Sequence, residues 1–594
     1  MSEPDEDVFS CILSHVQEPK TVHVLLRAVP KSHPLFSVAL RRLLELPVYL
    51  DSYDAIVASK EIIDYFVGPN ASEEALAIAQ AIRHLVIAAE AVRFRAEEVA
   101  VGDDVVAFRD SLSKLFERTR NLKSVDYYSC PGILLSPENI DVLATCEGLQ
   151  TFCVDASTKR ATWNTMEDVE DYETWNITPF ITSLGPSITS LELRGVCMAM
   201  LNDILSHRDV LATYKNLEHL KIDITEGAWD WGGGLGTPPL GASYDFIFPS
   251  LALPTVRRFE LVVSDFTVHL PRAGPLNLVD CSLLTDLSFD VRRGLWTDIT
   301  NIQIFMGLAA ADFPRLSHLE IKDTTTFKTL HERRVQWEPQ EEFPRSFHGL
   351  VDRFLGSLTN LTSLWVNENA LGLANGVGWN SQTYCSLRES WDSNSAHFHT
   401  TNKAAWRTAL KTALSKLESL GVGFGPMDDV EVGLVLGCCD PEKLRQFRFA
   451  WDWHKYGRDD PIPPELLVHI ARFPKLTDVH ILFPRPETQV SDPEIDARIL
   501  CDVAAIFKSN GSICRVGMGN SVMWERGPGG EGPEAILVCD GGSAPDLSVP
   551  KFYHAGYLPN EDTSSWNINP APRPPGRTEE IEQLRDLLHR ILGS

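Results

Sequence analysis

The sequence has no long apolar run and no basic leader. No stretch approaches the roughly 18 consecutive apolar residues that a membrane-spanning helix needs. The first residues, Met1 to Asp7, are acidic, whereas a secretory signal starts with basic residues followed by an apolar core. These absences predict an intracellular chain, cytoplasmic or nuclear, with no membrane as a partner.

Basic residues are scarce as well. The 594 residues include 54 Lys and Arg against 81 Asp and Glu, which gives a formal net charge of −27. Such a chain repels phosphate backbones, so no nucleic-acid partner is expected. The same acidic excess favours a basic protein as the partner of any extended recognition surface, with binding that weakens as salt is added.

Motifs that carry catalysis or bind metals are missing. The 12 cysteines contain no Cys-x-x-Cys, which predicts buried, reduced thiols and no paired zinc ligands. The sequence contains no Gly-x-Ser-x-Gly, no His-Glu-x-x-His and no Gly-Lys-Ser/Thr. His397 and His399 lack a third candidate ligand nearby, and Gly421, Gly423 and Gly425 do not match dinucleotide-binding spacing. We therefore expect a protein that is not an enzyme and has no cofactor, metal or catalytic residue.

One short pattern recurs throughout the chain. It consists of an apolar residue, two polar residues, an apolar residue, any residue and a third apolar residue, and turn residues such as Pro314 and Pro474 often precede it. Each occurrence predicts a chain that enters a short strand. The occurrences lie at 82–87, 122–127, 149–154, 188–193, 217–222, 256–261, 284–289, 316–321, 361–366, 417–422, 444–449, 476–481 and 513–518.

The segments between these strands predict helices, at 51–66, 74–80, 104–118 and 402–416. A strand, a turn and a helix repeated about every 30 residues predict an α/β fold, a solenoid of short parallel strands and helices. The pattern resembles leucine-rich repeats of the irregular kind over 46–520. A terminal strand near 535–539 and a Pro/Gly-rich linker are expected within 521–577, followed by an amphipathic helix within 578–594 that caps the repeats or contacts a partner.

The strand pattern places one residue of each repeat between two inward apolar residues, on the inner, concave face. Trp365, Arg448 and His480 occupy this position, and Trp451 and Trp453 follow one such strand. Trp and Arg often anchor partner recognition, so these five are the candidate substrate-binding residues. The alternative is that the tryptophans are half-buried in loop packing. Glu192, Lys221, Glu260, Ser288 and Glu320 form a row of mixed charge in earlier repeats.

Residues 1–45 show a different, helical pattern. Apolar residues at Val8, Phe9, Ile12, Leu13 and Val16 lie on one helical face, and two more apolar segments follow. Pro19 and Pro34 separate them into a small three-helix unit. At this size the unit requires cover from the repeats or from a partner.

This unit resembles the F-box family. The matching positions are Pro4, Val8, Phe9, Ile12, Leu13, Ser14, Val16, Leu25, Leu26, Val29 and Ser32. Together with the irregular repeats, they resemble a large fungal family of F-box proteins. The resemblance implies a substrate receptor of a cullin–RING ubiquitin ligase, in which Pro4, Val8, Phe9, Ile12, Leu13, Val16, Leu25, Leu26 and Val29 dock on a Skp-type adaptor, and through it on cullin, while the repeats hold a substrate protein. The alternatives are a helical cap on a leucine-rich-repeat scaffold unrelated to ubiquitin and, with no supporting motif, an enzyme assembled from distant loops.

Overall fold

The computed structural model describes only part of the chain. The described residues are 6–16, 19–51, 56–68, 71–88, 103–128, 137–155, 178–184, 187–196, 201, 204, 206–224, 253–263, 275–291, 311–323, 357–367, 414–427, 429–451, 461–482, 493–518, 522–527, 533–537, 552 and 578–592. The chain forms two compact units, Met1–Ser243 with Asn569–Ser594 as unit 1, and Tyr244–Ile568 as unit 2. The predicted segment boundaries at 45, 520 and 577 stay predictions.

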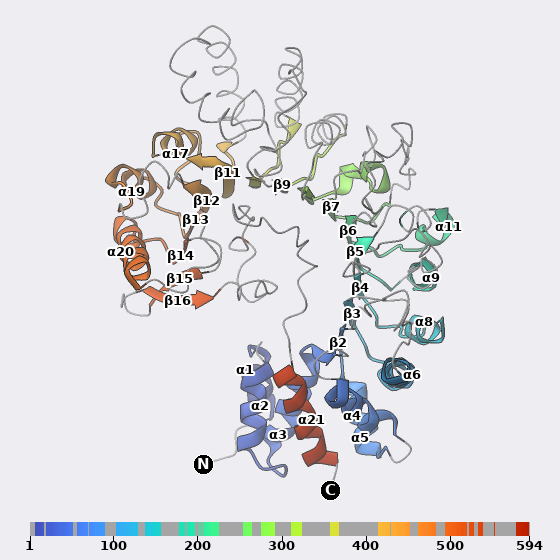
Figure 1. Ribbon diagram of the computed structural model, residues 1–594. Helices are drawn as coiled ribbons and strands as arrows, with labels where there is room; N and C mark the ends of the chain where they lie inside the picture. The colour runs from blue at the N-terminus through green and yellow to red at the C-terminus, as the bar shows by residue number, and fades with distance from the viewer. Residues whose placement is uncertain are drawn as a thin grey trace, which may run out of the picture. The chain divides into compact units, whose positions relative to one another are not determined.

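Unit 1 contains parallel strands that follow one another in chain order. They are β1 (Val48–Asp51), β2 (His84–Ala88), β3 (Ser124–Tyr128), β4 (Thr151–Asp155), β5 (Ser190–Val196) and β6 (His219–Ile224). Helices α4 (Ile56–Val67), α5 (Glu73–Ala81), α6 (Asp103–Arg118), α8 (Pro137–Ala144), α9 (Thr178–Ser183) and α11 (Arg208–Leu211) connect them. Figure 1 shows α6, α8 and α9 stacked beside one another on one side of the strands.

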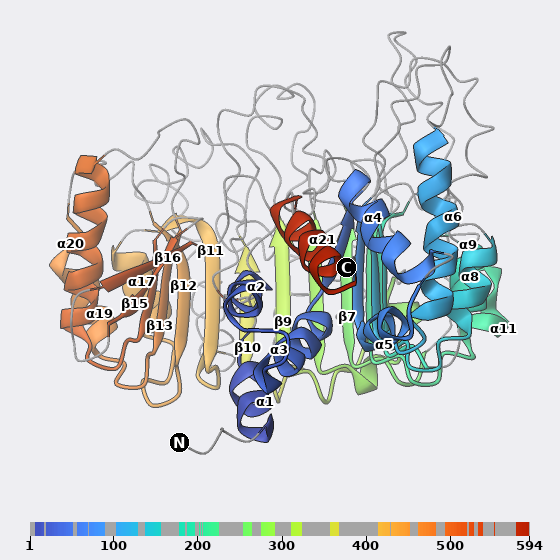
Figure 2. The same ribbon diagram turned by 90° about the horizontal axis from the view of Figure 1, so that it is seen from below.

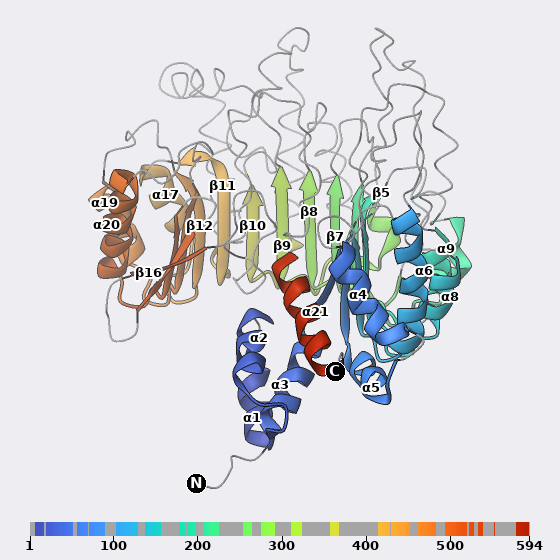
Figure 3. The ribbon, with the colours of Figure 1, turned by 60° about the horizontal axis from the view of Figure 1, so that its bottom comes forward.

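Unit 2 repeats this arrangement and then changes it. Strands β7 (Arg258–Val263), β8 (Asp286–Val291), β9 (His318–Asp323), β10 (Ser363–Asn367), β11 (Ser419–Met427), β12 (Gln446–Trp451), β13 (Asp478–Leu482) and β14 (Arg515–Met518) pair in parallel and in order. Strands β15 (Val522–Arg526) and β16 (Pro533–Leu537) are added antiparallel. Figure 2 and Figure 3 show the strands of this unit side by side, with α17 (Asp429–Leu436), α19 (Pro464–Ala471) and α20 (Pro493–Ser509) outside them.

These strands confirm the leucine-rich-repeat-like solenoid. Every segment that matches the six-residue pattern becomes a strand, but the strand begins two residues after the first apolar position, at Ser363 in the segment that starts at Leu361. That first apolar residue is buried as the chain turns into the strand; Leu284, Leu316 and Leu476 are each 0 % exposed. The predicted helices match α4, α5 and α6, whereas most of the predicted helix 402–416 lies outside the described residues.

A backbone link explains the polar pair of the pattern. In most of the repeats the residues at the two inner polar positions donate their N–H groups to one carbonyl of the preceding repeat: Thr362 N and Ser363 N both lie 2.9 Å from Ser317 O. The same link recurs from Thr477 and Asp478 to Arg445 O, at 2.8 and 3.0 Å. A hydroxyl at the first polar position adds a third donor, as Thr362 Oγ1 does at 3.2 Å. Ser and Thr are therefore frequent there because they bind neighbouring repeats together.

The N-terminal helices and the last helix pack together in unit 1. Helices α1 (Glu6–Ser14) and α2 (Pro19–Ala28) pack against α3 (Pro34–Glu45), with Pro19 and Pro34 as first residues of their helices. The last helix, α21 (Thr578–Leu592), contacts α2, α4 and β1, and Figure 1 shows it beside α2 and α4. Its apolar face, Ile581, Leu584, Leu587, Leu588 and Ile591, is buried. The amphipathic helix thus folds back as a cap on unit 1.

Candidate functional site: the inner face of the repeats

The strand register of unit 2 aligns one residue from each repeat on the face turned away from the helices, which we call the inner face. In order from β7 to β14 this inner row is Glu260, Ser288, Glu320, Trp365, Gly421, Arg448, His480 and Gly517. Trp365, Arg448 and His480 therefore share one register, as the sequence predicts. Leu364, Leu420 and Phe447, next to the row, alternate to the opposite face and form the core.

The candidate substrate-binding residues that the structure describes are buried. Trp365 is 7 % exposed, Arg448 6 % and His480 1 %, and Trp451 is 3 % exposed as the last residue of β12. Trp453 lies outside the described residues. The acidic residues of the row are covered too, because Glu260 is 8 % and Glu320 1 % exposed. The inner face of unit 2 is thus a buried surface that mixes aromatic rings with charges, and its candidate substrate-binding function stays a prediction.

Phe552 covers the centre of this face. Its side chain is 2 % exposed, and its ring centroid lies 6.0 Å from that of Trp365, edge to face, and 6.3 Å from that of His480. Arg448 Nη1 donates a hydrogen bond of 3.1 Å to the Phe552 carbonyl, while the guanidinium carbon lies 5.9 Å from the Phe552 ring. We call Trp365, Arg448 and His480, which surround this ring, the Phe552 site. It combines aromatic contacts with a backbone hydrogen bond to a cation.

Gly421 makes this geometry possible. Arg448 extends across β11 until its guanidinium carbon lies 4.9 Å from the Trp365 ring, and the Trp365 Nε1 donates to Ser419 Oγ at 2.8 Å. A Cβ at Gly421 would lie 3.1 Å from Arg448 Nε and 3.2 Å from Trp365 Cδ1. A side chain there would push the cation and the indole apart. The sequence shows three alternating glycines but gives no signal for this close contact.

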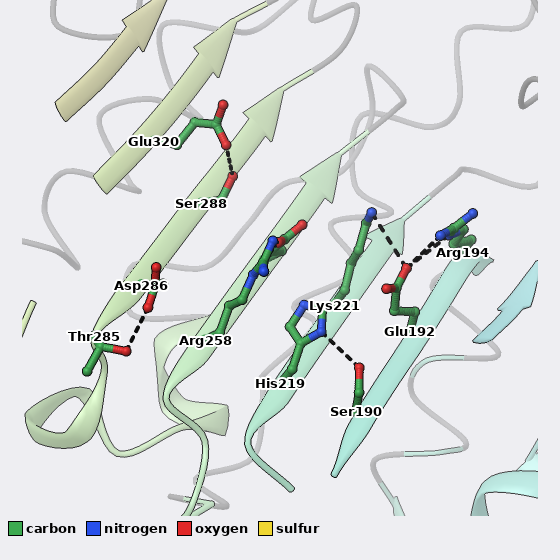
Figure 4. A network of polar contacts seen from close by, with 11 residues as sticks. Ser190, Glu192, Arg194, His219, Lys221, Arg258, Thr285, Asp286, Ser288 and Glu320 are labelled. Carbon is green, nitrogen blue, oxygen red and sulfur yellow. Dashed lines mark hydrogen bonds and ion pairs between the residues drawn. The ribbon is translucent and has the colours of Figure 1, made fainter. Parts of the chain in front are cut away.

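The buried charge of Arg448 is compensated within the same row. Burial lowers the pKa of Arg448, and the negative charge of Glu320 acts in the opposite direction. Glu320 in turn accepts a 3.1 Å hydrogen bond from Ser288 Oγ, which Figure 4 shows. Since an isolated buried guanidinium is very costly, the negative charge of Glu320 favours the charged form of Arg448.

The inner row of unit 1 is dominated by ion pairs. The register aligns Asp126, Cys153, Glu192 and Lys221. Arg194 Nη2 lies 2.7 Å and Lys221 Nζ 3.7 Å from Glu192 Oε2, as Figure 4 shows. Burial alone would raise the pKa of Glu192, but the two cations outweigh it and lower the pKa. Burial raises the pKa of Asp126 to about 6. The mixed-charge row predicted from the sequence is thus largely self-paired at this point.

A second polar row lies two residues before the inner row along each strand, and it is not among the candidate sites named from the sequence. Asp286, His318, Ser363, Ser419 and Asp478 share its register with other polar residues of unit 2. His318 Nδ1 and Ser363 Oγ lie 2.8 Å apart, and the His318 ring contacts Trp365 edge to face at 4.8 Å. The second polar residue of each six-residue pattern is the signal that predicts this row, because it lies two residues before the inner-row position.

The predicted adaptor-binding residues separate into exposed and buried groups. Ile12 is 58 % exposed, whereas Leu13 is 6 % and Leu26 0 % exposed. Phe9, Val16, Leu25 and Val29 are intermediate; Pro4 and the side chain of Val8 lie outside what the structure describes. Arg590 of α21 donates a 2.7 Å hydrogen bond to the Leu26 carbonyl. Leu13 and Leu26 are therefore core residues of unit 1, and Ile12 is the predicted contact most open to a partner.

Other candidate sites receive no support in the described part of the chain. Within it, no group of three or more His, Cys, Asp or Glu residues is arranged to hold a metal ion, and His397 and His399 lie outside it. Its helices include none long and apolar enough to cross a membrane. Of the cysteines that the structure describes, Cys146, Cys153 and Cys439 are buried, as the sequence predicts, whereas Cys11, Cys501 and Cys514 are exposed.

Comparisons with known proteins give distant structural likeness. No family model matches the chain, and no curated protein matches it. The leucine-rich-repeat-containing protein LegL7 from Legionella pneumophila is 10 % identical, with a TM-score of 0.28, over 76 % of this chain and 96 % of that one. TLR13, in a complex with ssRNA13, is 10 % identical, with a TM-score of 0.27, over 80 % of this chain and 52 % of that one. The fold itself is defined by the strand register described above.

Proposed function

We propose that this protein is a non-enzymatic substrate receptor of an SCF-type ubiquitin ligase. Helices α1 to α3 dock on a Skp-type adaptor and through it on cullin, the repeats hold a substrate protein, and other subunits transfer ubiquitin. The F-box resemblance of residues 4–32 supports the first part. The ordered ladder of repeats, which aligns one residue of each strand along one face, supports the second part.

The observation that carries the proposal is exposed apolar surface on the N-terminal helices. Ile12 on α1 is 58 % exposed and Val24 on α2 is 63 % exposed, although both helices bury other apolar residues against α3. Val24 precedes the predicted contact Leu25 in sequence and is not among the residues that the F-box resemblance implies. Large apolar side chains left open on a small helical unit suit a protein partner that covers them.

Co-purification of the full-length chain with a Skp-type adaptor tests the proposal. We expect the wild-type chain to retain the adaptor and Ile12→Glu or Val24→Glu to weaken retention at least roughly tenfold, because each buries a charge in an apolar contact. Val57→Glu is the matched control, since Val57 on α4 is 65 % exposed in the same unit. A wild-type chain that does not retain the adaptor, or Ile12→Glu and Val24→Glu variants that behave like Val57→Glu, would leave the scaffold unrelated to ubiquitin as the better description.

A further inference from the structure

The inner face of unit 2 contains an aromatic side chain that comes from far along the chain. Phe552 is 104 residues from Arg448, its hydrogen-bond partner, and belongs to none of the repeats. It nevertheless occupies the position where a leucine-rich-repeat fold offers its aligned residues. Trp365, Arg448 and His480, which the sequence predicts as binding residues from register and residue type, all contact it.

We propose that the Phe552 site recognises an aromatic residue in a partner peptide, and that Phe552 occupies the site in its absence. The peptide presents a Phe or similar side chain to Trp365 and His480 and its own carbonyl to Arg448. This inference rests on the binding function proposed above for the repeats and does not depend on the adaptor contact of α1.

The contacts explain why Phe552 acts as a stand-in for a ligand. Arg448 binds the main-chain carbonyl of Phe552, a group that every peptide carries, so this hydrogen bond selects for backbone and not for sequence. The ring contacts with Trp365 and His480 provide the selection for an aromatic side chain. Arg448 is bonded to a neutral carbonyl in this site, so the observed contact is to main chain and not to an acidic side chain. A partner segment therefore needs one aromatic residue whose own main-chain carbonyl is free to accept a hydrogen bond from Arg448.

A peptide with the sequence of residues 548–556, SVPKFYHAG, tests the inference in the full-length chain. Phe552→Ala should empty the site, so this variant should bind the fluorescently labelled peptide at least roughly tenfold more tightly than the wild type, in which the tethered Phe552 competes. The same peptide with Ala in place of its Phe should lose at least roughly tenfold in affinity for the variant. Circular dichroism establishes that the variant is folded.

Three outcomes would overturn the inference: a folded Phe552→Ala variant that does not bind the peptide, equal binding by wild type and variant, or equal binding of the Phe and Ala peptides. If Phe552→Ala does not fold, Phe552→Leu replaces it, because Leu keeps apolar bulk but loses the ring contacts; it must still bind the peptide more tightly than the wild type does. Adaptor retention is measured in parallel. Loss of adaptor binding with intact peptide binding contradicts only the ubiquitin-ligase proposal, and the reverse result contradicts only the Phe552 site.

Discussion

Replacing Glu320 by Gln removes the charge that compensates the buried Arg448. Glutamine keeps an amide oxygen for the 3.1 Å hydrogen bond from Ser288, so the change isolates the charge. Glu320 is 1 % and Arg448 6 % exposed, and removing one member of a buried charge pair typically costs about 3–5 kcal/mol. Glu320 lies on β9 and Arg448 on β12, so their interaction is weaker than that of a close buried pair. We therefore expect Glu320→Gln to lower the free energy of unfolding by the smallest value in this range, about 3 kcal/mol.

A double-mutant cycle measures how far the two charges depend on each other. Arg448→Met alone should cost a similar amount, since it leaves Glu320 uncompensated and removes the hydrogen bond to Phe552. The double variant should cost less than the sum, with a coupling of at least about 1 kcal/mol. The measurement is urea unfolding, monitored by hydrogen exchange of the β9–β12 amides. These amides report the stability of unit 2 separately from that of unit 1.

An exposed pair in the same unit provides the control cycle. Glu418 and Arg445 lie 3.7 Å apart, with side chains 56 % and 61 % exposed. Glu418→Gln and Arg445→Met should couple by about 0.5 kcal/mol or less, because water screens exposed pairs. If the Glu320 and Arg448 substitutions couple no more strongly than this pair does, the charge compensation described for the Phe552 site is incorrect.

Three further substitutions, two of them with a matched control variant, have defined outcomes. Burial lowers the pKa of His23 from 6.5 to about 4, so its contribution to stability is complete above pH 6.5 and is lost as pH falls toward 4. In His23→Leu the free energy of unfolding, measured as a function of pH, should therefore fall by about 3 kcal/mol less than in the wild type over this range. Gly421→Ala should cost about 1–3 kcal/mol because its Cβ meets an arginine and an indole within 3.2 Å, whereas Gly511→Ala, with nothing within 4 Å, should be neutral in thermal melts. Asn510→Ala removes hydrogen bonds to the Ile470 and Phe473 carbonyls, at 3.2 and 2.7 Å, and one from Ser512 N at 3.0 Å, and should lower the free energy of unfolding by about 2–4 kcal/mol. Asn121→Ala is the control, because it removes a single exposed hydrogen bond, of 2.9 Å to Gln80 O. It should lower the free energy of unfolding by less than about 1 kcal/mol in the same thermal melts.

The repeats were predictable from the sequence because their pattern is local. Leu361, Leu364 and the polar pair between them report burial and backbone pairing within six residues, and the period-two alternation then places Trp365 on the inner face. β1 lacks the full pattern and was missed. β15 also lacks the six-residue pattern, because an antiparallel strand is not part of the parallel repeat.

The buried state of the inner face was not predictable from local pattern. Alternation shows which way Arg448 and His480 point, but not what lies over them, and Phe552 has no periodic neighbours that mark it as their cover. The same limit applies to Leu26. The apolar face of its helix predicts that Leu26 is buried, but it does not show whether a partner protein or α21 covers it. Contacts between segments hundreds of residues apart leave no trace in a short window of sequence.

The position of α21 has a consequence for how the protein is made. Helices α2 and α4 and strand β1 emerge from the ribosome early, yet the helix that covers them begins at Thr578. At about 5–20 residues per second, synthesis leaves them without it for roughly half a minute to two minutes. During that interval the apolar surfaces destined for Leu584 and Leu588 are open to chaperones. Unit 1 therefore acquires this helix only after all of unit 2 has been translated.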